Sequence, residues 1–172
     1  GAWPTGSLAG LSLVNGEHNV TKLNLRLLGT FQATHGDTSL DGFRSDKVRA
    51  LLAYLAIEGG RSQRRETLQS LLWGEYPKAS AQASLRSALS NLRKVLRAAD
   101  ARSLLTSTRA SVTLHSDESQ CWVDIAEFDA LALAHQTHLH QGVVHCATCL
   151  RRMRRMAALY QGDFLAGLTL PD

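Results

Sequence analysis

One stretch, residues 79–98, constrains the fold more than any other part of the sequence. Placed on a helix at about 100° per residue, its apolar side chains form one stripe: Ala81, Leu85, Ala88, Leu89, Leu92 and Leu96. A stripe of this kind needs a hydrophobic core to cover it. The sequence therefore predicts a long amphipathic helix that packs on one side and is solvated on the other.

The opposite side of this helix carries no acidic residue. It presents small or polar residues flanked by arginines: Ala83, Ser87, Ser90, Asn91 and Lys94, with Arg86, Arg93 and Arg97 beside them. Small side chains let a helix lie close in a major groove, where Arg and Lys reach phosphates and Asn, Ser and Arg meet base edges. A solvated helix in a basic protein is the alternative, and this helix alone does not separate the two.

Basic residues are concentrated in the middle of the chain. The net charge is +4, yet residues 44–97 contain eleven Arg or Lys against four Asp or Glu, so the remainder is net negative. A basic middle with neutral or acidic ends suits a polyanionic partner.

The composition indicates a globular protein. Of the 172 residues, 44% are apolar and 20% are charged, which allows one domain, or a small domain with part of another. No apolar run is long enough to span a membrane. Residues 1–22 are interpreted as a leader or expression remnant that is partly disordered. Three cysteines, an odd number, do not form a secreted disulfide framework, which favours the cytoplasm.

The order of the expected elements indicates an α+β fold with a winged helix-turn-helix over residues 23–120. A small antiparallel sheet (23–31, 32–34 and 38–40) is followed by three helices and a hairpin (104–106 and 111–115). The first helix begins after the N-cap Ser45, with Val48, Leu51, Leu52 and Leu55 inward; the second covers 62–73, with Leu68, Leu71 and Leu72 inward; the third is 79–98. Helices two and three would form the reading unit and the hairpin the wing. Arg109 at the wing tip would enter a minor groove or touch phosphate, or would be an ordinary exposed turn residue.

Residues 121–172 are expected to begin a second, helical domain. A strand at 122–124 ends in Asp124, which with Glu127 resembles a capping box. Helices over 125–138 and 146–160 follow, the second with Leu150, Met153, Ala157 and Tyr160 inward. This helical hairpin is interpreted as the first pair of a TPR-like array that is cut short. Its basic residues, Arg151, Arg152, Arg154 and Arg155, are interpreted as a solvated face rather than a second nucleic-acid site.

Several motifs resemble bacterial transcriptional activators of the antibiotic-regulatory-protein (SARP) type. The segments that carry the resemblance are FRSDKVRALLAYLAIEGG, LQSLLWGE and ASLRSALSNLRKVL, and the tail LYQGDFLAGL resembles a landmark of the bacterial transcriptional activator domain (BTAD). The resemblance implies binding to double-stranded promoter DNA, usually direct repeats, by side-by-side protomers that recruit RNA polymerase. It places Arg86, Ser90, Asn91, Arg93 and Lys94 at reading and phosphate-clamping positions. Against the family pattern, the sequence leads us to expect an activator domain that stops after one helical hairpin, with no ATPase or sensor segment after it.

Histidines and cysteines cluster between residues 135 and 149. Cys146 and Cys149 form a Cys-x-x-Cys pair at an expected helix N-terminus, where the helix dipole favours a thiolate. Two imidazoles from the preceding helix end would complete a structural zinc site. The resemblance favours His138 and His140 over His135 and His145, because related activators have His-x-His and Cys-x-x-Cys at this spacing. A redox-active cysteine pair and ordinary surface histidines are the alternatives. Cys121 is interpreted as a small buried hydrophobe.

The sequence contains no motif that predicts an enzyme. A glycine-rich phosphate loop, His-Glu-x-x-His and Gly-x-Ser-x-Gly are all absent. The main hypothesis is a sequence-specific DNA-binding transcriptional regulator that uses Arg86, Ser87, Ser90, Asn91, Arg93, Lys94, Arg97 and Arg109. The alternative is a protein-interaction or metal- or redox-sensing module whose winged helix does not read DNA.

Overall fold

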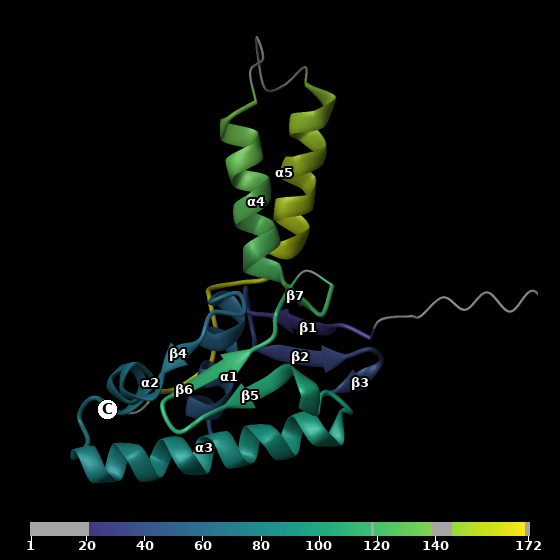
Figure 1. Cartoon of the computed structure of the whole chain (residues 1–172). Helices are drawn as coiled ribbons and strands as arrows, with labels where there is room; N and C mark the ends of the chain where they lie inside the picture. Colours follow the sequence, from purple (N-terminus) through teal and green to yellow (C-terminus); the bar gives the residue numbers. More distant parts are fainter. Residues whose placement is uncertain (1–20, 118, 139–145, 171–172) are drawn as a thin grey trace, which may run out of the picture.

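The computed structural model describes residues 21–117, 119–138 and 146–170. Its helices and strands follow one another in this order (Figure 1): β1 Leu23–Arg26, β2 Gln32–His35, β3 Thr38–Ser39, α1 Asp46–Ile57, β4 Gln63–Arg64, α2 Arg65–Trp73, α3 Lys78–Ala98, β5 Leu105–Ser107, β6 Ser111–Leu114, β7 Cys121–Val123, α4 Asp124–Gln136 and α5 Ala147–Leu159. The α+β fold class is confirmed. In Figure 1 the strands of the two sheets lie between α3, at the bottom, and the α4–α5 hairpin, which extends upward.

The first sheet has the strand order β3-β2-β1-β7. β1 pairs antiparallel with β2, so that Leu25 lies opposite Ala33, and β2 pairs antiparallel with β3. This antiparallel sheet was predicted. The addition of β7, parallel to β1, was not, because its pairing joins segments almost a hundred residues apart. Strand β7 thus attaches the helical hairpin to the N-terminal sheet.

The second sheet, in the order β4-β6-β5, forms the wing. The wing hairpin β5–β6 was predicted, but β4 was not, and residues 62–64 were expected to be helical. Gln63 pairs with Val112 and Arg64 with Ser111, so α2 begins only at Arg65. A two-residue strand has no periodicity of its own, and its partner lies far along the chain.

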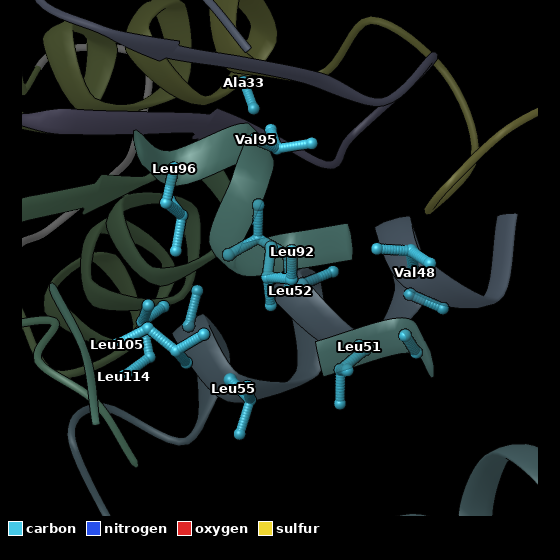
Figure 2. Close-up of a cluster of buried hydrophobic side chains, with 14 of the residues drawn as sticks. Ala33, Val48, Leu51, Leu52, Leu55, Leu92, Val95, Leu96, Leu105 and Leu114 are labelled. Carbon is cyan, nitrogen blue, oxygen red and sulfur yellow. The ribbon is translucent and has the colours of Figure 1, made fainter. Parts of the chain in front are cut away.

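The core forms where α3 packs on α1. All six residues of the predicted apolar stripe of α3 are buried, and so are the predicted inward residues of α1. Figure 2 shows Leu92 of α3 against Leu52 of α1, with Leu105 and Leu114 of the wing strands near Leu55. The wing and the helices therefore share one core.

One predicted core residue of α2 is on the surface. Leu71 is 52% exposed, whereas Leu68 and Leu72 are buried. The short helix packs against α3 through a narrow face that also includes the buried Trp73. Leu71 lies about 100° from Leu72 around the helix and falls outside that face.

The predicted capping box at the start of α4 is wrong. Val123 still pairs with Leu25 in the sheet and occupies the N-cap, which places Asp124 one residue inside the helix. The buried carboxylate of Asp124 instead accepts hydrogen bonds from the backbone N–H groups of Leu27 (2.8 Å), Leu28 (3.0 Å) and Ile125 (2.8 Å).

The packed face of α5 also differs from the prediction. Met153, Ala157 and Tyr160 are exposed and Leu150 is half-buried; the buried residues are Cys149 and Leu159. Arg152 is half-buried too, and it donates to the Ala134 carbonyl of α4 (2.7 Å), so it is not part of a solvated face. Among the described elements the main contact of α5 is with α4, and apolar residues outside that narrow contact, such as Met153, remain exposed.

The tail after α5 returns to the first sheet. The Leu165 N–H donates to the Leu27 carbonyl (2.7 Å) and the Gln161 N–H to the Leu28 carbonyl (3.2 Å). Gly29 has φ +118°, and a Cβ there would lie 3.0 Å from the Cβ of Gln161. A glycine is therefore required where the tail crosses the end of β1.

None of the helices in the described part of the chain combines the length and the apolar character needed to cross a bilayer.

Candidate functional site

The outer face of α3 is cationic and exposed. Six of the predicted DNA-binding residues lie on it with exposed side chains: Arg86, Ser87, Ser90, Arg93, Lys94 and Arg97. The 21-residue helix contains no Asp or Glu. In Figure 1, α3 runs along the lower margin of the molecule, and the α4–α5 hairpin rises from the opposite side. The face therefore points away from the rest of the described chain.

Within the part of the chain that the structure describes, the cations of α3 take part in no ion pair. Across residues 21–117, 119–138 and 146–170, the ion pairs join Arg49 to Asp46, Arg61 to Glu58 and Arg155 to Glu127. Each pair is local or belongs to the α4–α5 hairpin. The charge of the α3 face thus remains available to an anionic partner.

The prediction that Asn91 lies on this face is wrong. Asn91 is only 6% exposed. Its side-chain carbonyl accepts from the Arg44 N–H (2.9 Å), and its amide group donates to the Gly42 carbonyl (3.0 Å). Both polar atoms of the side chain are satisfied by the segment that precedes α1. Asn91 therefore anchors this segment to α3 and is not placed to meet bases.

Replacing Asn91 with Ala is expected to lower the free energy of unfolding by about 1–2 kcal/mol, because the Arg44 N–H and the Gly42 carbonyl, both in part-buried hydrogen bonds, lose their partner. Urea denaturation followed by circular dichroism measures the change. The neighbouring exposed Ser90→Ala serves as control, with an expected change within about 0.5 kcal/mol. Equal stability of the two variants would contradict the anchoring role.

The wing places Arg109 at its tip. Arg109 is exposed in the turn between β5 and β6, as predicted. The Thr108 hydroxyl accepts from the N–H groups of Ala110 (3.1 Å) and Ser111 (3.0 Å), which holds the turn in shape. The position of Arg109 fits a contact with the DNA backbone or minor groove beside a helix in the major groove.

Two arginines tie the wing to the helices, and neither role was predicted. Arg65 of α2 donates to the Thr108 carbonyl (2.9 Å), and Arg93 of α3 donates to the Ser107 hydroxyl. These contacts hold the wing and α3 as one surface. Nothing in the local sequence signals them, because each joins residues from separate elements.

A groove of about 510 Å³ lies between the start of α1 and the first half of α3. Arg44 and Lys47 line it from α1 and the preceding segment, and Ser84 and Ser87 line it from α3. These two cations were not among the predicted contacts. The signal available in the sequence was their place in the basic middle segment.

The cysteine–histidine cluster lies at the far end of the α4–α5 hairpin. Cys146 is the N-cap of α5, Cys149 lies in its first turn, and His138 follows the end of α4. The Cys146 Sγ lies 3.4 Å from the His138 Nε2, and the ligand atoms of all three residues lie within 4.8 Å of one another. His140 and His145 lie outside the described residues, so the part of His140 in a zinc site stays a prediction.

The three cysteines differ in their environment. The Cys149 N–H donates to the Cys146 sulfur and lowers the pKa of Cys146, whereas burial raises the pKa of Cys149. Burial also raises the pKa of Cys121 to about 12. The prediction that Cys121 is a small buried hydrophobe is confirmed.

Comparison with known proteins identifies relatives of this chain. The transcriptional regulatory protein EmbR of Mycobacterium tuberculosis is 32% identical over 140 residues, which cover 77% of this chain and 35% of EmbR. The regulatory protein AfsR of Streptomyces coelicolor is 33% identical over 150 residues, which cover 87% of this chain and 14% of AfsR. This chain is a homologue of both regulators. No family model matches it.

The solved structure of M. tuberculosis EmbR in complex with a low affinity phosphopeptide has the same fold. Its TM-score against this EmbR homologue is 0.66 at 30% identity, over 86% of this chain and 38% of that chain. These matches confirm the resemblance to SARP-type regulators and the winged-helix fold. The names of the relatives also agree with the prediction that the chain is not an enzyme. The chain spans about a third of EmbR and less of AfsR.

Proposed function

We propose that this chain is the sequence-specific DNA-binding module of a bacterial transcriptional activator. The observation that carries the proposal is the exposed, acid-free face of α3, with its six outward side chains, on a fold shared with transcriptional regulators. Arg and Lys on this face supply a sequence-independent attraction to phosphates, and its polar groups supply base contacts.

The dimensions of α3 fit a major groove. A helix with its side chains is about 10–12 Å wide, and the groove is about 12 Å wide. Ser87 and Ser90 lie near the middle of the exposed face, where short side chains let the backbone approach the bases. Arg86 can reach a guanine edge, and Lys94 acts as a point charge on phosphate.

The wing and the start of α1 extend the surface beyond α3. Arg109 at the wing tip contacts the backbone or the adjacent minor groove, and Arg44 and Lys47 contact phosphate beside the first half of α3. Contacts of this kind set the orientation of the protein on the duplex without reading sequence.

The partners of the whole regulator follow from the same proposal. Side-by-side protomers bind direct repeats in promoter DNA in the cytoplasm and recruit RNA polymerase. The relationship to named transcriptional regulators supports this part of the proposal.

Selection of bound duplexes from a random pool tests the proposal, followed by affinity measurements on the selected site and on single-base variants of it. Arg86→Ala is expected to relax the preference at one base position by about 1–3 kcal/mol. Lys94→Ala is expected to weaken binding to all the duplexes alike, because it removes a phosphate contact.

A pool that shows no enrichment would contradict sequence-specific binding and favour a protein-interaction or metal- or redox-sensing module. Equal effects of the two substitutions on every duplex would contradict the assignment of Arg86 to a base edge.

A further inference from the structure

Three metal-ligating side chains meet where α4 ends and α5 begins. His138 comes from the end of α4, and Cys146 and Cys149 come from the first turn of α5. Their ligand atoms lie within 4.8 Å of one another. The cluster is therefore built from two separate helix ends and not from one helix N-terminus alone.

The geometry of the cluster fits zinc. Zn–S bonds of about 2.3 Å and Zn–N bonds of about 2.0–2.1 Å at tetrahedral angles place ligand atoms roughly 3.5–3.8 Å apart. The separation of 3.4 Å between the Cys146 Sγ and the His138 Nε2 is close to this spacing. Two sulfurs and one imidazole form a donor set that binds zinc in preference to hard cations such as Mg²⁺.

Arg152 of α5 donates to the Ala134 carbonyl of α4 (2.7 Å) in the outer half of the hairpin, but the apolar packing of the described residues is concentrated at the end next to the sheet. Next to the sheet, Leu159 is buried, and the Arg155 Nε donates to the Glu127 Oε1 (2.6 Å). Farther out, Leu133 is 63% exposed and Met153 is 43% exposed, so apolar packing there is sparse. At the far end, the one fully buried side chain of the described residues is Cys149. A cross-link between the two helices would therefore add most stability to the hairpin at this far end.

We propose that His138, Cys146 and Cys149 bind a structural Zn²⁺ that joins α4 to α5 at the far end of the hairpin. Both thiols release their protons to solvent on binding, and the resulting thiolates balance the charge of the ion. A further donor or a water completes the tetrahedron. The site is separate from the α3 face and does not depend on DNA binding.

Metal content and Zn²⁺ affinity of the whole chain test this proposal. We expect one Zn²⁺ per chain after purification without added metal. His138→Ala, Cys146→Ser and Cys149→Ser should each weaken Zn²⁺ affinity by at least ~100-fold, because each removes one of the coordinating atoms. Cys121→Ser and His115→Ala, which change the same residue types elsewhere, should leave it unchanged. Co²⁺ substitution should give a thiolate-to-metal charge-transfer band that Cys146→Ser reduces.

Thermal unfolding with and without a chelator shows whether His138 is a Zn²⁺ ligand or only a structural residue. Chelation should lower the melting temperature of the wild-type chain and leave the melting temperature of the His138→Ala variant unchanged. His138 is only half-buried, so the variant is expected to fold. Metal-free protein with unchanged melting after chelation would overturn the proposal. So would a Cys146–Cys149 disulfide in protein that binds no Zn²⁺, since it would assign the pair to redox chemistry.

Discussion

Reversing two charges on α3, as Arg86→Glu with Lys94→Glu, is expected to weaken duplex DNA binding on the order of 100-fold at moderate salt, or about 2.7 kcal/mol. Both side chains are exposed and take part in no ion pair among the described residues. The reversal removes two phosphate or base contacts and places two carboxylates against the DNA. Arg93 is left intact, because its hydrogen bond to Ser107 supports the wing. Fluorescence anisotropy with a labelled duplex measures the change.

The α5 helix offers a matched control. Arg151→Glu with Arg154→Glu changes the net charge by the same amount at two exposed positions of the α4–α5 hairpin. This pair is expected to change duplex affinity by less than about threefold, through the long-range field alone. If the two double variants lost affinity equally, net charge and not the α3 face would govern binding.

Replacing Asp124 with Ala is expected to lower the free energy of unfolding by about 3–4 kcal/mol. The carboxylate is 1% exposed and accepts hydrogen bonds from the backbone N–H groups of Leu27 and Leu28 at the end of β1. Its removal leaves these buried donors without a partner at the point where the sheet joins α4. Urea denaturation followed by circular dichroism measures the loss.

Asp129→Ala is the control for Asp124, because it removes the same group from an exposed position of the same helix. Its expected effect is within about 0.5 kcal/mol. Asp124→Asn keeps one acceptor oxygen and should lose less stability than Asp124→Ala. An Asp124→Ala variant as stable as the Asp129→Ala variant would show that the buried carboxylate does not join the two parts of the chain.

Long periodic segments were predictable from the sequence. The stripe of α3 repeats over about four turns, so one hydrophobic face is specified whatever packs against it. The same argument succeeded for α1. It failed for α5, whose main contact among the described elements is with α4, and for Leu71, which lies at the edge of the packed face of a short helix.

Residues at the boundary of a helix face could not be assigned from periodicity. Asn91 lies next to the exposed Ser90 on α3 and yet is buried. The burial of Asn91 depends on the segment before α1, which folds against the Asn91 side chain. The capping box at Asp124 failed for a related reason, since pairing of Val123 with β1 shifts the start of α4 by one residue. Local patterns give the exposed cations of the candidate site, and tertiary contacts decide which polar residues face inward.

The salt dependence of duplex binding tests the central claim most directly. Phosphate contacts from Arg44, Lys47, Arg93, Lys94, Arg97 and Arg109 predict a slope of about −5 for log K against log salt concentration, at about 0.9 per neutralised phosphate. The double variant Arg86→Glu with Lys94→Glu should reduce the steepness of this slope by about 1, because Lys94 is the phosphate contact of the pair. A slope near zero in the wild-type chain, or an unchanged slope in the variant, would contradict the assignment of the α3 face to DNA.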